Sequence, residues 1–152
     1  MTVNNVRVGV ACIIKHHFED GLKFLVSQRK GSHGVGHWQI PGGHLEFNES
    51  FEQCAKREAY EETNLKVDKC KFITATNDIM VKENKHYVTI FMLASHIENI
   101  NDLRTTEPDK VQGDWSWVTW KDLTQKSPLF LPLSQFVNAT ENDPAIQKIL
   151  GL

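Results

Sequence analysis

The segment from Glu49 to Thr63 constrains the fold most, because its apolar residues recur with the period of a single amphipathic helix. One face of this helix would carry Phe51, Cys54, Ala55 and, just beyond its end, Leu65. Asn48 suits the N-cap with Glu49 in the first turn, and Asn64 can adopt the left-handed conformation that ends helices. The sequence therefore predicts a helix that buries one face against a core.

Three glutamates crowd into the last turns of this helix, and two of them lie on the apolar face. Glu58 and Glu62 fall in the middle of the apolar stripe, and Glu61 lies at its edge. A solvated acidic helix end is the ordinary interpretation of a charge cluster, but this placement counts against it. Arg57 can pair with Glu61 one turn away, which leaves Glu58 and Glu62 without a cation on their own face. Like charges on a half-buried face cost stability, so a bound divalent cation is the simplest explanation.

The ligand chemistry favours Mg²⁺ or Mn²⁺, because the cluster offers carboxylate oxygens without a cysteine or a correctly spaced histidine. Mg²⁺ in proteins keeps several waters and engages substrate phosphates, which indicates phosphoryl or pyrophosphoryl chemistry. The preceding "IPGGH" fits this interpretation, because Gly42 and Gly43 allow the backbone to approach a metal or a phosphate. Arg29 and Lys30 lie upstream as candidate phosphate partners.

Segments of strand composition precede and follow the helix. Residues 6–15 and 22–29 form apolar runs separated by "HHFEDG", whose Asp-Gly pair suits a hairpin turn. The glycine-rich stretch after them predicts a loop around a short extended piece at 38–40. Further strands are expected at 69–80, 86–97 and 114–120, and short helices at 131–140 and 144–150. This order predicts an α+β domain with a layered mixed sheet.

Length and composition indicate one globular domain over residues 1–152. The chain has 40% hydrophobic and 24% charged residues, enough to bury one sizeable core. Its formal net charge of -2 provides no basic field, so neither nucleic acid nor a membrane is an expected partner. Three cysteines without a CxxC pair argue against a disulfide framework and for a reducing compartment. The N-terminal apolar run is too short for a membrane span, and we expect a cytoplasmic location, with the nucleus as an additional one.

The residues around the glutamates have the spacing of a known motif. They are Gly43, Glu49, Arg57, Glu58, Ala59, Glu61, Glu62 and Leu65. In this spacing the chain resembles the Nudix hydrolases, whose box places a Gly, a Glu, an Arg-Glu pair and a Glu-Glu pair in this order. Two positions depart from the box: Asn64 stands where it has Gly, and Ala59 stands where a larger aliphatic residue is usual. Asn is the best non-glycine left-handed cap, so we expect the first change to be tolerated.

Stretches outside the box narrow the likeness. "RKGSHGVGHWQIPGGHLEF", "KENKHYVTIFM" and the segment around "WSWVTWKDL" are similar to the eukaryotic subgroup that contains MutT homologue two and its plant relatives, which sanitise nucleotide pools. The similarity covers the chain from about Val8 to Phe136. It implies the Nudix fold, an α/β/α sandwich with a central mixed β-sheet. It also implies Mg²⁺-dependent hydrolysis of a nucleoside triphosphate to monophosphate and pyrophosphate, and a homodimer.

The resemblance also implies roles for individual residues. Glu58 and Glu62 match metal ligands of the box, Glu61 is its third acidic position, and Gly43 matches a glycine whose backbone helps to hold the metal. Arg57 matches the arginine that orients a glutamate. A carboxylate would accept the proton of the attacking water, and Glu61 and Glu62 are the alternatives for this catalytic role.

The substrate pocket is implied by the same resemblance. It would place Ile40, His44, Thr89, Phe130 and Leu133 near the nucleotide, with Arg29 as a phosphate partner. The competing interpretation is ordinary core packing for the apolar members and an ordinary strand position for Thr89. Trp115 and Trp117, with Val118 or Trp120, alternate across the faces of the expected strand, where core and interface packing explain the tryptophans better than a platform for a base.

Three functions remain open on the sequence. The first is a diphosphatase for (d)NTPs such as dGTP or GTP, including oxidised forms such as 8-oxo-dGTP. The second is a Nudix hydrolase for another diphosphate, such as a dinucleoside polyphosphate, a nucleotide sugar or a prenyl diphosphate, because the box specifies only the bond that is cut. The third is a non-catalytic nucleotide-binding module, which the presence of all three carboxylates disfavours.

Overall fold

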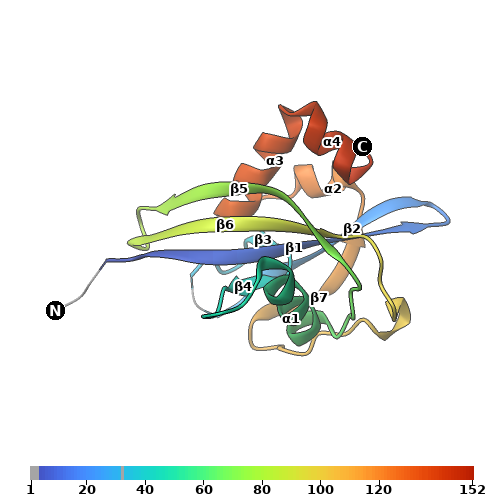
Figure 1. The fold of residues 1–152 in the computed structure, drawn as a ribbon, viewed down its shortest axis with the longest axis horizontal. Helices are drawn as coiled ribbons and strands as arrows, with labels where there is room; N and C mark the ends of the chain where they lie inside the picture. The colour runs from blue at the N-terminus through green and yellow to red at the C-terminus, as the bar shows by residue number, and fades with distance from the viewer. Residues whose placement is uncertain (1–3, 32) are drawn as a thin grey trace.

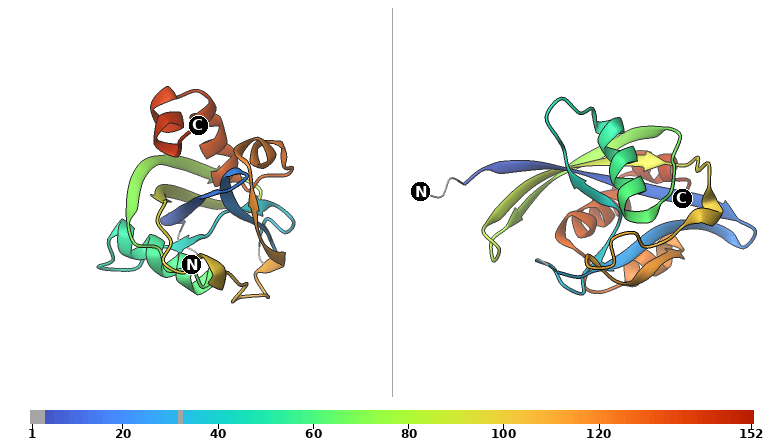
Figure 2. Two further views of the ribbon diagram at one scale, coloured as in Figure 1. Left: turned by 90° about the vertical axis from the view of Figure 1, so that its right-hand side faces the viewer. Right: turned by 90° about the horizontal axis from the view of Figure 1, so that it is seen from below.

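Two helical layers enclose a mixed β-sheet in the computed structural model, which describes residues 4–31 and 33–152. Helix α1 (Phe51–Thr63) covers one face, and three C-terminal helices cover the other (Figure 1). These are α2 (Trp120–Gln125), α3 (Leu131–Glu141) and α4 (Pro144–Leu150). Figure 2 shows the sheet between the two layers. The α/β/α sandwich predicted for the chain is therefore confirmed.

The sheet is built around two long parallel strands, β1 (Val6–Phe18) and β6 (Lys85–Ala94). The other strands are β2 (Gly21–Arg29), β3 (Trp38–Gln39), β4 (Gly42–His44), β5 (Cys70–Met80) and β7 (Val111–Val118). The order is β3-β2-β1-β6-β5, with β4 also paired to β1 and β7 also paired to β2. All pairs except β1 with β6 are antiparallel, so the sheet is mixed.

Both faces of strand β1 are apolar, as expected for a central strand that helices cover on both sides. Val10, Cys12 and Ile14 pack in the core cluster that contains α1, whereas Ala11 and Ile13 pack in the cluster that contains α3 and α4. This alternation follows from the two-residue period of a strand. The face of β1 that carries Ala11 also forms part of the cavity described below.

Helix α1 begins two residues later than expected. Ser50 is the N-cap: its hydroxyl accepts from Gln53 N at 3.0 Å, and the Gln53 side chain accepts from Ser50 N at 2.8 Å. This capping box satisfies two otherwise free N–H groups, which explains why Ser50 prevails over the predicted Asn48. Asn48 instead has a positive φ of 68° in the preceding turn. The predicted left-handed cap at Asn64 is confirmed, with φ 64° and its N–H bonded to Tyr60 O.

Three strand boundaries also differ from the expectation. The β1–β2 hairpin turns tightly at residues 19–20, because "HHF" of the expected turn continues β1. Gly42 and Gly43, expected in a loop, belong to β4, which pairs with the edge of β1. Trp120 begins α2 rather than ending a strand, because the Thr119 side chain caps this helix by accepting from Asp122 N.

The cysteines pack as small core residues. Cys12, Cys54 and Cys70 are buried and free. In the described part of the chain, no helix has the length and apolar character needed to cross a bilayer.

Candidate active site

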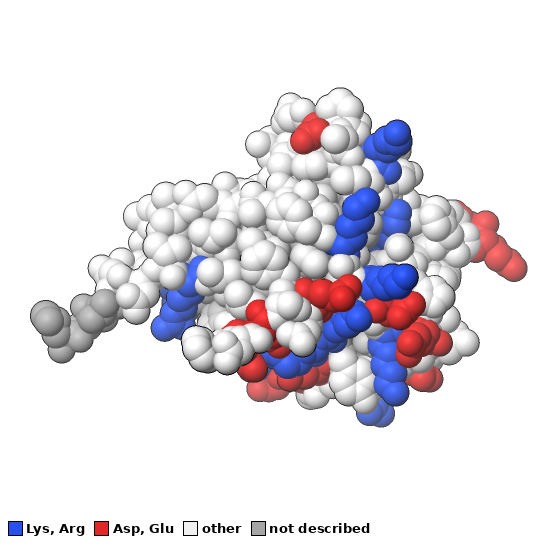
Figure 3. All heavy atoms as spheres, viewed as in Figure 1, with Lys and Arg blue, Asp and Glu red and all other residues white. Residues whose placement is uncertain are grey.

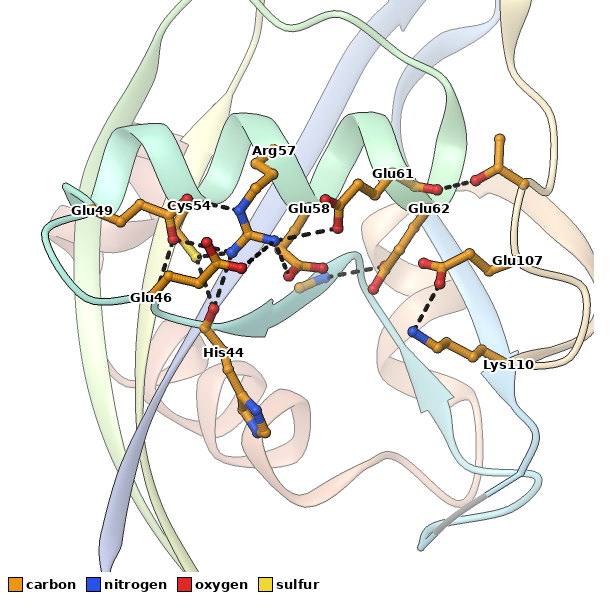
Figure 4. Close-up of polar contacts among 12 residues, drawn as sticks. His44, Glu46, Glu49, Cys54, Arg57, Glu58, Glu61, Glu62, Glu107 and Lys110 are labelled. Carbon is orange, nitrogen blue, oxygen red and sulfur yellow. Dashed lines mark hydrogen bonds and ion pairs between the residues drawn. The ribbon is translucent and has the colours of Figure 1, made fainter.

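Arg57 organises the carboxylates on α1 (Figure 4). Its guanidinium binds both oxygens of Glu49, at 2.7 and 3.0 Å, and donates through Nη1 to Glu58 at 2.8 Å and to Glu61 at 3.2 Å. It also donates to the carbonyl of His44 on β4 at 3.1 Å. The predicted pair of Arg57 with Glu61 is confirmed. The expectation that Glu58 has no cationic partner is wrong, because the long Arg57 side chain reaches across to its neighbour.

Glu49 lies outside the helix, contrary to its expected place in the first turn. It is the main partner of Arg57, and only 11% of its side chain is exposed. The bidentate ion pair lowers the pKa of Glu49 to about 2. Glu49 therefore fixes the orientation of Arg57, which in turn holds Glu58.

Glu62 carries the least compensated charge of the group. Its Oε2 accepts from Gly42 N at 3.2 Å, and no Lys, Arg or His in the described ranges forms an ion pair with it. Burial, and then the charge of Glu58, raise the pKa of Glu62 well above its usual value. Burial also raises the pKa of Glu58, although Arg57 opposes this shift. Glu58 and Glu62 thus share a poorly solvated space, and of these two Arg57 pairs only with Glu58.

Strand β4 brings glycine against the helix at this point. A Cβ on Gly43 would lie 2.3 Å from Cδ and from Oε1 of Glu58, which is far inside van der Waals contact. Pairing of Gly43 with Val10 holds β4 in this register. Only a residue without a side chain lets the Glu58 carboxylate lie against the strand.

The donor set suits a hard divalent cation. Within the described residues, 4–31 and 33–152, no group of three Asp, Glu, His or Cys side chains lies close enough together to bind a metal on its own. Mg²⁺, however, takes one or two carboxylates and completes its shell with waters and substrate phosphates. Glu58 and Glu62, with raised pKa values and the recess left by Gly43, fit this requirement. Glu61 is not part of the pair, because its half-exposed side chain turns to Arg57.

A cavity of about 650 Å³ opens beside these carboxylates. All six side chains predicted to contact substrate line it, namely Arg29, Ile40, His44, Thr89, Phe130 and Leu133. Gly43, Glu58 and Glu62 also line it, whereas Arg57 and Glu61 do not. The structure thus brings together residues from β2, β4, β6, α1 and the start of α3.

Arg29 is held over Phe130 within this cavity. The guanidinium carbon lies 3.9 Å from the ring centroid, and Nη1 and Nε donate to Gln39 Oε1 and His33 O. Burial lowers the pKa of Arg29, and none of the described carboxylates lies within ion-pair distance of it. A fixed, partly desolvated guanidinium without a carboxylate partner is suited to an anionic ligand.

The cavity also contains charged residues that sequence reasoning missed. Glu107 and Lys110 form an ion pair at 2.7 Å beside Glu62, as Figure 4 shows. Tyr87 stacks on His44, with Tyr87 Oη 2.9 Å from His44 Nε2. Glu107 lies in an irregular loop without a periodic pattern, so the periodicity of the sequence did not indicate it.

Trp115 is a core residue, as expected. It is 5% exposed, and its indole N–H donates to the carbonyl of Glu62 at 3.1 Å. It therefore supports the end of α1 from behind and does not face the cavity.

Comparison with known proteins decides the family. The model of the NUDIX domain matches residues 5–139. The chain belongs to the Nudix family. It is therefore a Nudix hydrolase acting on substrates with a pyrophosphate linkage, as the box predicted. Phosphatase NudJ of Escherichia coli (strain K12) is 32% identical over 127 residues, which span 83% of this chain and 76% of NudJ.

Solved structures agree with this assignment. MutT NUDIX hydrolase from Burkholderia pseudomallei superposes with a TM-score of 0.73 at 25% identity, covering 96% of this chain and 99% of that one. The MutT protein from Methanosarcina mazei Go1 shares the fold, with a TM-score of 0.76 at 20% identity and coverage of 93% and 97%. The narrower likeness to the eukaryotic nucleotide-sanitising subgroup stays a prediction.

Proposed function

We propose that this Nudix hydrolase converts (d)NTPs, with dGTP or GTP and oxidised forms such as 8-oxo-dGTP foremost, to nucleoside monophosphate and pyrophosphate. The observation that carries the proposal is the single cavity that joins the Glu58–Glu62 pair to an apolar recess with Arg29 at its wall. Its volume of about 650 Å³ lies in the range that holds a small-molecule ligand. A triphosphate needs the acidic end, and a base needs the apolar recess.

The chain's own residues have distinct roles in this proposal. Glu58 and Glu62 bind Mg²⁺, or Mn²⁺ in its place, and Gly43 gives Glu58 the space to do so. Bound metal supplies Lewis-acid polarisation of the phosphate and a water of lowered pKa. Arg57 is a positioning residue, because it holds Glu58 from outside the cavity.

We assign proton acceptance to Glu62 in preference to Glu61. A general base must face the reacting water, and Glu62 lines the cavity whereas Glu61 does not. Glu61 would have to leave Arg57 to reach the metal as its third acidic ligand.

Substrate contacts are proposed for the six predicted residues. Arg29 would bind a phosphate oxygen, since its charge has no carboxylate partner among the described residues. The nucleoside would lie among Ile40, His44, Thr89, Phe130 and Leu133.

The test is to quantify pyrophosphate and orthophosphate released from dGTP with and without Mg²⁺. We expect Mg²⁺-dependent pyrophosphate release, reduced at least about 100-fold in Glu62→Gln. Glu52→Gln is the matched control, because Glu52 lies on the same helix and accepts from Cys70 N at 2.9 Å, a bond that a glutamine oxygen keeps. Folded wild-type protein that releases neither product from dGTP would refute the proposal.

The similarity to NudJ favours one alternative outcome. That relative is named a phosphatase, so cleavage of a terminal phosphate with orthophosphate as product is the second candidate. Orthophosphate appearing before pyrophosphate would select it. Activity on a dinucleoside polyphosphate, a nucleotide sugar or a prenyl diphosphate, but not on dGTP, would select the other diphosphate class.

We also propose a homodimer that works in the cytoplasm, where the buried thiols stay reduced. Few charges lie over β5 and β6 in Figure 3, and exposed apolar residues on these and the adjoining strand include Val6, Val8, Phe72 and Ile79. A surface with few charges can meet its own copy with little like-charge repulsion. Light scattering that gives the 17.4 kDa monomer mass at all protein concentrations would exclude the dimer.

A further inference from the structure

Asp78 on β5 is a buried carboxylate with an unusual set of partners. It is fully buried, and its two oxygens accept from neutral groups: Thr89 Oγ1 bonds Oδ2 at 2.5 Å and Gln135 Nε2 bonds Oδ1 at 2.5 Å. No cation in the described ranges forms an ion pair with it. Buried carboxylates usually have a charged partner, so this arrangement needs an explanation.

The orientation of the Gln135 side-chain amide is fixed by two acceptors. Gln135 Nε2 also donates to the backbone carbonyl of Asn77 at 3.0 Å. Both amide protons of Gln135 are therefore used, and turning the amide over would lose two acceptors at once. Thr89 Oγ1 donates to Oδ2 of Asp78, so the single hydroxyl proton of Thr89 is used within this group.

Thr89 is the member of this group that reaches the cavity. It pairs with Gly9 across the β1–β6 ladder, and Gly9 also lines the cavity. A Cβ on Gly9 would lie 3.9 Å from Thr89 Oγ1, so the glycine leaves the space beside the hydroxyl open. Because the proton of Thr89 points to Asp78, only lone pairs of its oxygen remain for a ligand.

A phosphate does not suit this position. Phosphate oxygens are acceptors and need a donor, which Thr89 cannot provide while Asp78 holds its proton. A neutral part of a ligand that carries an N–H group fits this position better than a phosphate does.

We propose that Asp78 sets Thr89 as a hydrogen-bond acceptor for the nucleobase, so that the site selects bases that present an N–H donor. Asp78 is a positioning residue in this scheme, and Thr89 is the specificity-determining contact. The inference rests on the proposed function, in that the substrate is a nucleotide. It deepens that function by stating which edge chemistry the base must have.

Asp78→Asn tests the direction of the network with little change in shape. Gln135 still needs an acceptor, so it orients the new amide with its oxygen toward Gln135 and its NH₂ toward Thr89. Thr89 then accepts from Asn and turns its own proton to the cavity. The preference for a donor on the base should disappear or invert.

The substrates separate the two donors of guanine. They are dGTP, with a ring N–H and a 2-amino group; dITP, with the ring N–H alone; O6-methyl-dGTP, with the amino group alone; and the triphosphate of 6-methoxypurine deoxyriboside, with neither. We expect wild type to favour a base with the contacted donor by about 10-fold or more in kcat/KM. Asp78→Asn and Thr89→Val should bring this ratio to about 1 or below, whereas Thr89→Ser should keep it.

Two controls separate positioning from a structural role. Asp114→Asn changes a surface carboxylate that accepts from Thr105 Oγ1 at 3.1 Å, and it should leave the ratio unchanged. Asp78→Asn placed in the Thr89→Val protein should not change the ratio further, because the group it acts through is gone. A uniform loss on all four substrates in both backgrounds would show a structural role and overturn the proposal.

The remaining outcomes are also decisive. Wild type that does not discriminate, or discrimination that survives Thr89→Val, overturns the inference and leaves the proposed function standing. If wild type hydrolyses none of the four nucleotides, the proposed function is refuted. The dissociation constants of the four monophosphates then show whether the site still prefers a base with an N–H donor. If circular dichroism shows that Asp78→Asn does not fold, Thr89→Val is compared with Thr89→Ser. Loss of the preference in Thr89→Val alone would support the hydroxyl as the acceptor, and its retention in both variants would overturn the inference.

Discussion

The carboxylate of Glu58 occupies the space that a side chain on Gly43 would need, since a Cβ there would lie 2.3 Å from the carboxyl carbon. A glycine and a glutamate fifteen positions apart in sequence thus share one site in space. The glycine keeps the carboxylate against β4, and Arg57 fixes it from the other side at 2.8 Å.

Alanine substitutions at Gly43, Gly42 and Gly9 should separate an effect on activity from an effect on stability. In Gly43→Ala the new methyl displaces the end of a flexible side chain, so we expect a small change in Tm and a fall of about 100-fold in kcat/KM. In Gly42→Ala the methyl would lie 2.7 Å from the backbone oxygen of Val10, which cannot move away easily. This variant should lose about 1–3 kcal/mol of stability.

Gly9→Ala is the matched control for this series. Its methyl would meet only ordinary contacts of 3.7 to 3.9 Å. We expect normal stability and an effect mainly on KM, because the methyl enters the cavity floor. Full activity of Gly43→Ala with an unchanged Mg²⁺ requirement would contradict the role given to the recess.

Glu62→Gln should stabilise the metal-free protein while removing activity. Glutamine keeps the bond from Gly42 N but removes a buried, uncompensated charge. We expect Tm in EDTA at neutral pH to rise by about 2–4 °C, the shift that roughly 1 kcal/mol gives in a domain of this size. Mg²⁺ should raise the Tm of wild type but not that of the variant. A lower Tm for the variant in EDTA would contradict the burial argument.

The pH dependence of stability should reveal the same charge. Folding raises the pKa of Glu62, so between its ordinary and raised values the folded state binds more protons than the unfolded state. Metal-free stability is therefore fully present below the ordinary carboxyl pKa and decreases as pH rises through the raised one. Urea unfolding between pH 4 and 8 should show this decrease in wild type and a flatter profile in Glu62→Gln.

Arg57→Lys should weaken metal binding although it keeps the positive charge. A lysine cannot hold both oxygens of Glu49 and also reach Glu58 and the His44 carbonyl. We expect the Mg²⁺ concentration for half-maximal activity to increase about 10- to 100-fold. Lys56→Gln is the control, since that neighbouring cation makes only a 3.8 Å pair with the partly exposed Glu52. Equal effects of the two substitutions would show a general charge effect instead.

Glu49→Gln should make the protein less sensitive to acid. The pKa of Glu49 is lowered to about 2 when folded, so its contribution is present above the ordinary carboxyl pKa and is lost as pH falls toward 2. We expect a loss of about 1–2 kcal/mol at neutral pH, reduced from the full linkage value by solvent around Arg57. Unfolding measured from pH 6 to 2 should be flatter in the variant than in wild type.

Local periodicity explains which parts of the site could be predicted. The placement of Glu58 and Glu62 on the inner face of α1 follows from helix geometry within one segment, and the structure agrees. The N-cap was misplaced because Asn48 and Ser50 have similar capping chemistry, and the decision depends on the Gln53 side chain. Strand β4 has no strand composition, and it forms because β1 offers it an edge with free N–H and C=O groups.

The rest of the cavity depends on distant pairing that no local pattern records. Thr89 meets Gly9 only through the register of β1 with β6, and Asp78 meets Gln135 only through the packing of α3 on β5. Glu107 and Lys110 come from an irregular loop whose course is set by its ends. Such contacts arise from the tertiary fold, so the sequence alone left Asp78 without a role.

The end of α1 depends on the segment that leads into β7. Arg104 N donates to Thr63 O, Thr106 donates to the carbonyls of Glu61 and Glu62, and the Trp115 indole bonds that of Glu62 as well. The helical turn that carries Glu61 and Glu62 is therefore held, through its backbone carbonyls, by a part of the chain made some forty residues later. During synthesis on the ribosome, the helix can form early, but its last turn gains these bonds only after Trp115 has emerged. A nascent chain that stops short of that point would carry the motif without the site.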